Sequence, residues 1–523
     1  MFKSFAGRKN FMLQGGILAI SGIIVRLIGM IYRIPMNNII GSEGAGLYSA
    51  AFEIYNIALI LSSYGMPMAV SKLVSARLAT KEYTNTRYIF RRALIISLIT
   101  GGIASLILFF GALGIEHVLY SGFPGMAIPL RFLAPTVFVV AILGTIRGFF
   151  QGQGTMIPTA TSQLVEQIVN AVVSIVASYG FTKAYADSIY QDAHGASGGT
   201  FGTFMGALAA LAVVVVLLIR NRHLYGQKLR EDMGAQVMAP NETYKLIILT
   251  VVPIILGQTF YNLTSVLDGI FWNNIAKGWL DLSAIKAHYG NYGSTFSTLT
   301  SIPMGIASAM SASMLPSIVK SYTRGDKKSI NAKIRKTVRA TMIVAIPFVI
   351  ALAVLGEPVI QLLFPRFDSV QGSIMLKIGS AAIAFYTLST ISGAALQGLD
   401  KMRIPVVHSM ISLGIHIPLT IILLFTTRLG IYSIVIGIMQ FSAVVFILNF
   451  RSLYRLNGYR QEIVGSFLAP LFCAAVMGIA ILLLYRGLYA VIGHNLPVLI
   501  ISGVVGVLIY FGMLTGVKKL RWY

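Results

Sequence analysis

The sequence predicts an all-α polytopic membrane protein of about fourteen transmembrane helices. Hydrophobic residues make up 56% of the 523 residues and charged residues only 11%, whereas soluble domains carry about 25% charged residues. The apolar residues also form long runs that are broken by Gly, Pro or charge. Since a spanning helix needs roughly 20 apolar residues, a chain of this length accommodates about fourteen spans with their loops.

The apolar runs fall into two groups, separated by the polar stretch 220–245. The first group predicts spans at 11–35, 45–75, 89–113, 127–150, 157–181 and 200–219. The second group predicts spans at 246–274, 290–319, 338–356, 373–397, 404–427, 429–450, 464–485 and 496–516. The basic N-terminus resembles a signal peptide, but Arg26 interrupts its apolar run and no small-residue cleavage site follows. We therefore expect a retained first helix.

The net charge of +24 reflects membrane topology, because Lys and Arg concentrate in alternate short loops. The basic clusters lie at 77–92, 220–230, 320–339, 401–403, 451–460 and 518–521. This alternation predicts that both termini are cytoplasmic, in a bacterial cytoplasmic membrane, with the basic loops facing anionic lipid headgroups. We expect no nucleic-acid partner. The single cysteine, Cys473, allows no intrachain disulfide, and no Cys/His spacing suggests a metal site.

The two halves of the chain carry matching features in the same order, which indicates parallel repeats. At an offset of 244 residues, the polar segment 80–93 aligns with 324–337, so that Glu82 falls on Asp326. Gln-Gly followed by a helix-opening Pro occurs at 151–158 and again at 397–405. We therefore predict an N-lobe at 1–240, a C-lobe at 241–457 and two additional helices at 458–523.

Four segments resemble the multidrug/oligosaccharidyl-lipid/polysaccharide (MOP) exporter superfamily. The nearest branch is that of the polysaccharide transporters, with the MurJ-type lipid II flippases and the stage V sporulation protein B group. The segments are VRLIGMIYRIPMNNIIGSEGAGLY, YGMPMAVSKLVSARLATKEY, RGFFQGQGTMIPTATSQLVEQIV and SIPMGIASAMSASMLPSIVKSYTRGD. The resemblance implies two six-helix lobes that form a V around a central cavity. It also implies alternating access and an undecaprenyl-linked saccharide as substrate, moved from the cytoplasmic to the outer leaflet.

The sequence also departs from part of that family. Gram-negative lipid II flippases carry further cavity arginines in spans two and eight, and the corresponding segments 47–59 and 296–303 lack them here. This difference favours the Gram-positive branch or another polyprenyl-linked sugar.

Two arginines in the first span are the leading candidates for substrate binding. Arg26 and Arg33 lie two turns apart on one helix face, and a guanidinium binds phosphate oxygens bidentately. An ionisable residue at mid-bilayer costs roughly 2.5–3.5 kcal/mol, which makes it a functional candidate. The alternative interpretation pairs these arginines with Glu53 or Glu166 as structural ion pairs.

Four further charged residues are weaker candidates for the substrate site. Glu53 and Glu166 lie within predicted spans two and five. Lys72 and Arg147 lie near the cytoplasmic ends of spans two and four. For these two cations we expect anchoring at lipid headgroups first and substrate gating second.

An ion-coupling role is predicted for the seventh span. Relatives in the family have a sodium site partly on this span, and Asp268 with Asn262 in YNLTSVLDGI matches it by position. The alternative is an acid that is hydrogen-bonded near the outer interface. No nucleotide-binding motif occurs, so we expect transport driven by Na⁺, H⁺ or the membrane potential, without a cofactor, by a monomer.

Of three candidate functions, a flippase for a polyprenyl-diphosphate-linked saccharide fits the sequence best. A multidrug cation antiporter of the same superfamily would favour acidic cavities, whereas the first helix carries arginine. A membrane glycosyltransferase or ligase needs a sizeable external domain, and the external loops here are short. The pair His408 and His416 and the spacing Gly198/Gly202 are interpreted as helix packing.

Overall fold

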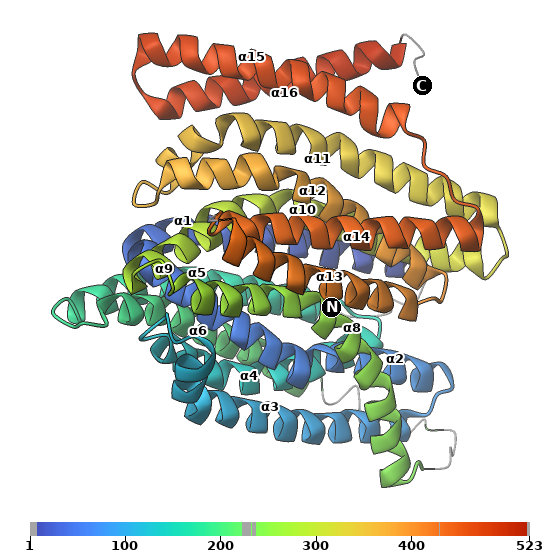
Figure 1. Cartoon of the computed structure of the whole chain (residues 1–523). Coiled ribbons are helices and arrows are strands. Elements are labelled where there is room, and N and C mark those ends of the chain that lie inside the picture. Colours follow the sequence, from blue (N-terminus) through green and yellow to red (C-terminus); the bar gives the residue numbers. More distant parts are fainter. Residues whose placement is uncertain (1–7, 222–231, 233–236, 428, 520–523) are drawn as a thin grey trace. The chain divides into compact units, whose positions relative to one another are not determined.

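The computed structural model describes residues 8–221, 232, 237–427 and 429–519, and every regular element in these ranges is a helix (Figure 1). The first elements are α1 (Arg8–Leu59), the π-helix η1 (Ile60–Tyr64), α2 (Met66–Ala79), α3 (Tyr83–Leu119), α4 (Ala127–Gly152), α5 (Ile157–Ala184) and α6 (Gln191–Arg220). They are followed by α8 (Pro240–Ala276), α9 (Leu282–Asn291), η2 (Tyr292–Ser297), α10 (Thr298–Tyr322), α11 (Lys327–Leu363), α12 (Ser369–Gly398), α13 (Arg403–Thr426), α14 (Tyr432–Asn457), η3 (Val464–Leu468), α15 (Ala469–Ile492) and α16 (Asn495–Lys519).

The predicted all-α polytopic fold is confirmed, and each predicted span coincides with one helix or with consecutive helices. Among the described residues, 12 helical stretches are long and apolar enough to cross a membrane. One of these, Ile24–Ala79, contains the second predicted span and the last part of the first. The seventh predicted span corresponds to α8, which is not among the 12.

Helix α1 folds back on itself at Gly41, which separates the first two spans. Gly41 has φ 72° and ψ −178°, a left-handed φ that favours glycine. In a straight helix Arg33 and Phe52 would lie about 28 Å apart. Instead, the Arg33 guanidinium lies 5.8 Å from the centre of the Phe52 ring. The two arms of α1 are therefore neighbours, and the turn between them is very short.

The chain forms two compact units, residues 1–286 and 287–523. The first contains α1 to α6, α8 and the start of α9, and the second contains the remaining helices. The lobe boundaries at residues 240 and 457, and the V between the lobes, stay a prediction.

In the first unit, glycine allows α5 and α6 to touch along their backbones. A Cβ atom at Gly198 would overlap the backbone of Ser178, and one at Gly202 would overlap Ser174. The hydroxyl of Ser174 donates a hydrogen bond of 3.0 Å to the carbonyl of Gly199, which is possible only at such close approach. The predicted packing role of the Gly198/Gly202 pair is confirmed.

A Gly202→Ala substitution is expected to destabilise the protein by about 1–3 kcal/mol, because the added methyl group overpacks the α5–α6 contact. Thermal unfolding of the purified protein in detergent measures this. Gly180→Ala is the matched control on α5, since no atom lies within 4 Å of the added Cβ. An equal loss of stability in both variants would contradict the close-packing interpretation.

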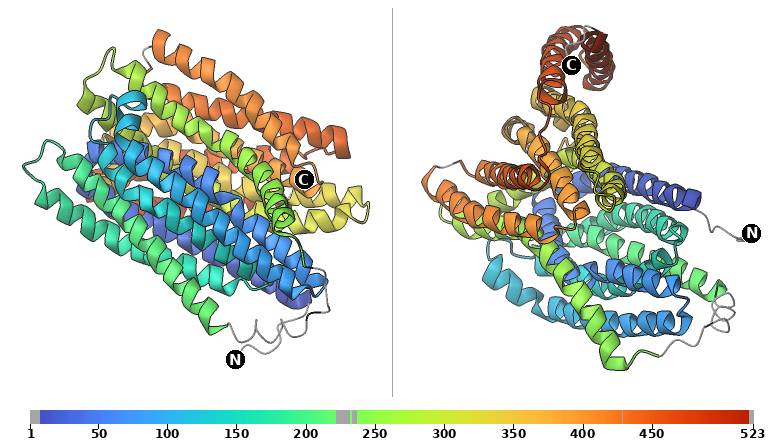
Figure 2. Two further views of the ribbon diagram at one scale, coloured as in Figure 1. Left: turned by 90° about the horizontal axis from the view of Figure 1, so that it is seen from below. Right: turned by 90° about the vertical axis from the view of Figure 1, so that its right-hand side faces the viewer.

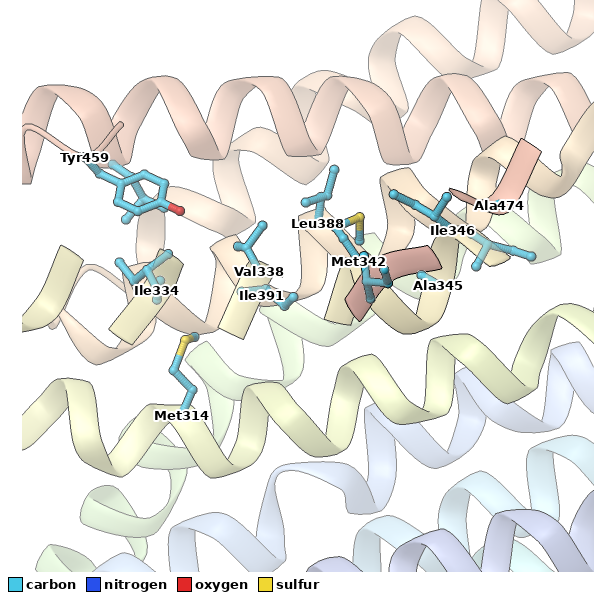
Figure 3. Packing of buried hydrophobic residues seen from close by; sticks show 14 of the residues in the cluster. Met314, Ile334, Val338, Met342, Ala345, Ile346, Leu388, Ile391, Tyr459 and Ala474 are labelled. Atoms are coloured by element: carbon cyan, nitrogen blue, oxygen red, sulfur yellow. The ribbon is translucent and has the colours of Figure 1, made fainter. Parts of the chain in front are cut away.

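In the second unit, the core is built around α11 (Figure 3). Buried side chains of α11 such as Val338 and Met342 pack in one cluster with Leu388 and Ile391 of α12. The antiparallel pair α15 and α16 lies along α11 (Figure 2), and the Tyr510 hydroxyl donates a hydrogen bond of 2.8 Å to Ile343.

The two histidines of α13 are part of the packing of the second unit. The ring Nδ1 of His408 lies 2.7 Å from the Asn449 side-chain oxygen of α14. His416 is fully buried and lies edge-on to Phe441. These contacts agree with the interpretation of both residues as helix packing.

Candidate functional site

A polar seam runs between α1 and α5 in the first unit. It comprises Arg33 and the α5 residues Gln163, Glu166, Gln167 and Asn170, which recur at helical spacing and so share one face of α5. The side chain of Asn170 donates a hydrogen bond of 3.2 Å to the Tyr32 hydroxyl. A Cβ atom at Gly29 would lie 3.6 Å from the Gln167 oxygen, so α1 approaches α5 closely at this point.

Arg33 is a half-buried cation surrounded by aromatic rings. Its guanidinium lies over the Phe52 ring at 5.8 Å from the ring centre. Tyr32 and Tyr48 are close enough to interact with it electrostatically. Among the residues that the structure describes, no carboxylate forms an ion pair with Arg33. Its positive charge is therefore held in place without being neutralised.

Arg26 lies two turns before Arg33 and is exposed. The adjacent side chains of Leu27 and Ile31 are exposed as well. Within the described part of the chain, Arg26 forms no ion pair with Glu53 or Glu166. The structural ion pairs considered for Arg26 and Arg33 are thus not found there.

Glu166 instead pairs with Arg147, which joins α5 to α4. The guanidinium Nη2 of Arg147 donates a hydrogen bond of 2.7 Å to Glu166 Oε2. Its Nε donates another, of 2.9 Å, to the Ser162 hydroxyl. The Arg147 side chain is only 13% exposed, so the expectation that it anchors a helix end at lipid headgroups is wrong. Lys72, in contrast, is exposed on α2.

Glu53 and Asp268 both lie near Tyr120, which follows α3. Tyr120 is fully buried, and both carboxylates lie close enough to its hydroxyl to affect it electrostatically. Its hydroxyl donates a hydrogen bond of 3.3 Å to the backbone of Val266, two residues before Asp268 on α8. Asp268 is almost completely buried. The structure thus brings two of the predicted acids to one aromatic residue, while Asn262 lies two turns away on α8.

The predicted outer end of the first unit is held together by polar contacts. The carboxylate of Glu43 forms an ion pair of 2.6 Å with Lys286 and accepts a hydrogen bond of 2.5 Å from Ser283. Asn273 and Asn274 at the end of α8 each donate a hydrogen bond of 2.9 Å to the carbonyl of Leu119. These contacts join the α1 turn and the α3–α4 loop to α8 and α9.

Several polar residues of the first unit were missed by the sequence interpretation. Arg131 lies within the fourth predicted span, and its buried Nε has no hydrogen-bond partner among the described residues. A search for single charges inside predicted spans could have found it. The buried oxygens of Tyr48, Gln163 and Gln167 also lack a partner in the described chain, and no sequence pattern singles out these common residue types.

The comparison with known families decides the identity at the level of family. A family model described as "Polysaccharide biosynthesis protein" matches residues 13–322, more than half of the chain. The chain belongs to this polysaccharide biosynthesis protein family. A second model, MatE, matches residues 253–422. Together they confirm the resemblance to the MOP exporter superfamily, in its polysaccharide transporter branch, and the chain is a multi-pass membrane protein of that superfamily.

Two curated relatives from Bacillus subtilis match most of this member of the polysaccharide biosynthesis family. Lipid II flippase MurJ is 26% identical over 508 residues, covering 89% of this chain and 86% of the relative. Stage V sporulation protein B is 24% identical over 455 residues, covering 84% of this chain and 83% of the relative. Both are proteins of comparable length that align almost from end to end.

Solved structures show the same fold. Lipid II flippase MurJ in an inward closed conformation superimposes with a TM-score of 0.69 at 13% identity, covering 96% of this chain and 99% of the other. An inward-facing multidrug resistance MATE family transporter of the MOP superfamily gives 0.65 at 15% identity, covering 83% and 97%. At these identities the likeness concerns the fold alone.

Proposed function

We propose that the protein is a flippase that moves an undecaprenyl-diphosphate-linked saccharide, lipid II or a related wall precursor, from the cytoplasmic to the outer leaflet by alternating access. The observation that carries this proposal is the half-buried guanidinium of Arg33, for which no described carboxylate provides charge neutralisation. The similarity to lipid II flippase MurJ supports the same substrate class.

The chemistry of the polar seam suits such a headgroup. A diphosphate has to pass about 30 Å of hydrocarbon, where an unpaired charge is costly. Arg33 offers a bidentate donor pair to phosphate oxygens. The buried side-chain oxygens of Gln163 and Gln167, which lack a partner within the described residues, can accept hydrogen bonds from sugar hydroxyls. The guanidinium and the two side-chain oxygens together suit a ligand that carries both a phosphate and a sugar.

The charge balance of the seam disfavours the antiporter alternative. Because Glu166 is already paired with Arg147, these two residues carry no net charge. Arg33 is left in excess, so the seam is positive, whereas a cation antiporter needs a negative site. A glycosyltransferase or ligase is disfavoured by the connections between helices, which are short throughout the described chain.

Replacement of the flippase in living cells tests the proposal. The gene is expressed in a strain depleted of its own lipid II flippase, and growth is expected to be restored. Arg26→Ala is expected to abolish the rescue at normal protein level in the membrane, because the exposed guanidinium provides the first phosphate contact. Arg87→Ala, an exposed cation on α3, is the matched control. Normal growth with Arg26→Ala would rule out this contact, and failure of the wild-type gene would refute the lipid II assignment.

For ion coupling we propose Asp268, with Asn262 on the same helix and Glu53 across Tyr120. An Asp268→Asn change keeps the shape but removes the charge, so transport in proteoliposomes should no longer respond to an imposed Na⁺ or H⁺ gradient. Asp187→Asn, in an exposed loop, is the control and should respond as wild type does. If the gradient still accelerates the Asp268→Asn variant, coupling does not depend on this carboxylate.

We further propose that both termini lie in the cytoplasm and that the protein works as a monomer with membrane lipids as its surroundings. The alternation of basic and neutral loops supports the orientation. The basic loops 320–339 and 401–403 then face the cytoplasm, together with the turn between α2 and α3.

A further inference from the structure

A small cavity opens at the predicted cytoplasmic end of the second unit, far along the chain from the polar seam. Its volume is about 180 Å³. It lies where α10 and α12 end, α11 begins and α14 ends. The cavity is lined by Tyr322, Gly325, Lys327, Ile330, Leu399, Lys401, Leu456 and Asn457. Because all of these residues belong to the second unit, the cavity is a property of that unit alone.

The walls of the cavity are fixed by hydrogen bonds between helix ends. The side chains of Asn331 and Asn457 bond α11 to α14, with a distance of 2.5 Å between Nδ2 of Asn457 and Oδ1 of Asn331. Asp326 caps α11 by accepting a hydrogen bond of 2.9 Å from the Ser329 backbone. The backbone of Lys401 donates a hydrogen bond of 3.0 Å to Leu396. The cavity is therefore already formed before any ligand enters.

Two cations line the cavity and are not used by the protein itself. Among the described residues, neither Lys327 nor Lys401 has a side-chain hydrogen bond or an ion pair. Lys333 behaves differently, since its ammonium group donates hydrogen bonds of 2.7 Å to the carbonyl of Ser317 and 2.6 Å to the hydroxyl of Ser321. The two lining lysines thus remain available to an anion from outside.

Basic residues around the cavity make its electrostatic potential more positive. Between residues 320 and 339 the sequence has eight Lys or Arg residues and a single acid, Asp326. The remaining lining is largely apolar, with Ile330, Leu399 and Leu456 forming the wall. A ligand that matches both the basic residues and the apolar wall has a negatively charged headgroup and an apolar chain.

In the first half of the chain, a carboxylate of the protein lies at the start of α3, which the predicted repeat aligns with the start of α11. There, the backbone N–H of Thr84, at the start of α3, donates a hydrogen bond of 2.7 Å to Asp232. Nearby, the backbone of Met238 donates a hydrogen bond of 3.0 Å to Asn85. At the repeat offset of 244 residues, Thr84 corresponds to Lys328. If the predicted repeat holds, the helix start that corresponds to that of α11 has an anion beside it, supplied by Asp232.

We propose that this cavity binds the phosphate group of an anionic phospholipid of the inner leaflet, with Lys327 and Lys401 as its cationic contacts. Basic pockets between the cytoplasmic ends of membrane helices are suited to such headgroups. A lipid occupant is favoured over free phosphate because the apolar wall provides a surface for the glycerol and the first methylene groups. The proposal is independent of the transport substrate.

The test measures lipid binding to the purified full-length protein in detergent, with phosphatidylglycerol as the probe. Phosphatidylcholine and inorganic phosphate are the comparison ligands. In a thermal-shift titration, phosphatidylglycerol is expected to stabilise the wild type, and the other two ligands are not. In the Lys327→Gln/Lys401→Gln variant, phosphatidylglycerol binding is expected to be about twenty-fivefold weaker, because each lysine near an anionic headgroup strengthens binding roughly fivefold.

Two further variants distinguish the cavity from general surface charge. Lys320→Gln/Lys328→Gln removes the same charge from exposed neighbours that do not line the cavity, and it should lose much less affinity. Leu456→Trp fills the apolar part of the cavity with no change in charge, and it should weaken binding of phosphatidylglycerol as well. If both double variants lose the same affinity for phosphatidylglycerol, the assignment of the binding site to the cavity is overturned. A wild-type response to inorganic phosphate equal to that to phosphatidylglycerol would overturn the lipid assignment, and equal responses to both lipids would overturn the role of the phosphate charge.

Discussion

Replacing Arg33 by Gln is expected to slow flipping of a lipid-linked saccharide by at least about thirtyfold. Loss of one partner from a buried, hydrogen-bonded charge pair costs 2–5 kcal/mol or more, and in the proposed mechanism Arg33 is such a partner of the diphosphate. Its guanidinium is already positioned over Phe52 beside Tyr48, so little ordering is left for the binding step. The rate is measured with fluorescent lipid II in proteoliposomes.

Two further variants test whether the effect of Arg33→Gln depends on the guanidinium at this position. Arg33→Lys keeps the charge but loses the planar pair of donors, so an intermediate rate is expected. Arg87→Gln removes an exposed cation of α3 and should leave the rate unchanged. Because Arg33 has no ion-pair partner among the described residues, its loss should hardly change thermal stability. A normal flipping rate in Arg33→Gln would exclude Arg33 as the diphosphate contact.

Removing the Glu166 side chain is expected to lower the stability of the protein by about 3 kcal/mol. Glu166→Ala leaves the guanidinium of Arg147 without its carboxylate at a position where the arginine is only 13% exposed. Breaking a buried ion pair on one side costs about 3–5 kcal/mol, because the remaining charge is unpaired. Thermal unfolding in detergent measures the loss.

The double variant Arg147→Ala/Glu166→Ala should recover part of this stability, because no unpaired charge remains. Arg77→Ala provides a matched control. It breaks the Arg77–Glu82 pair at the α2–α3 turn, where the arginine is 32% exposed, and such pairs contribute at most about 1 kcal/mol. If Glu166→Ala is no less stable than Arg77→Ala, the pair does not hold α4 to α5.

The helices could be predicted from the sequence because lipid imposes a simple requirement on each span. Every backbone group within the hydrocarbon must be bonded inside its own helix, so an apolar run of sufficient length becomes a helix. The breaks between runs are equally local. Gly41 separates the first two spans because its φ of 72° suits glycine and few other residues.

The contacts between helices could not be predicted in this way, because they depend on the rotation of each helix about its own axis. Arg147 lies near the end of one span and Glu166 within the next, and hydropathy gives no sign that the two side chains meet at 2.7 Å. For this reason headgroup anchoring was expected for Arg147. The proximity of Glu53 and Asp268 to Tyr120 could not be predicted either, because Tyr120 lies in a loop that is distant from both in sequence.

The roles of the candidate site residues remain predictions for a related reason. A guanidinium without a carboxylate partner, such as that of Arg33, indicates an anion-binding position but not which anion binds there. In the proposed mechanism, the sugar attached to the diphosphate would contact neutral groups such as the side chains of Gln163 and Gln167, whose buried oxygens lack a partner among the described residues. These residue types are common in any sequence, so composition and spacing carry no information about the sugar.

The tight reversal at Gly41 limits where the predicted outer face can be probed. Epitope tags and protease sites need several residues of accessible backbone, and the connection between the two arms of α1 offers none, because helix flanks Gly41 on both sides. The loop between α5 and α6 is better suited, since Ile189 at its tip is 97% exposed. A reporter inserted beside Ile189 would therefore report the sidedness of the membrane insertion, whereas one placed at Gly41 would disrupt the hairpin that positions Arg33.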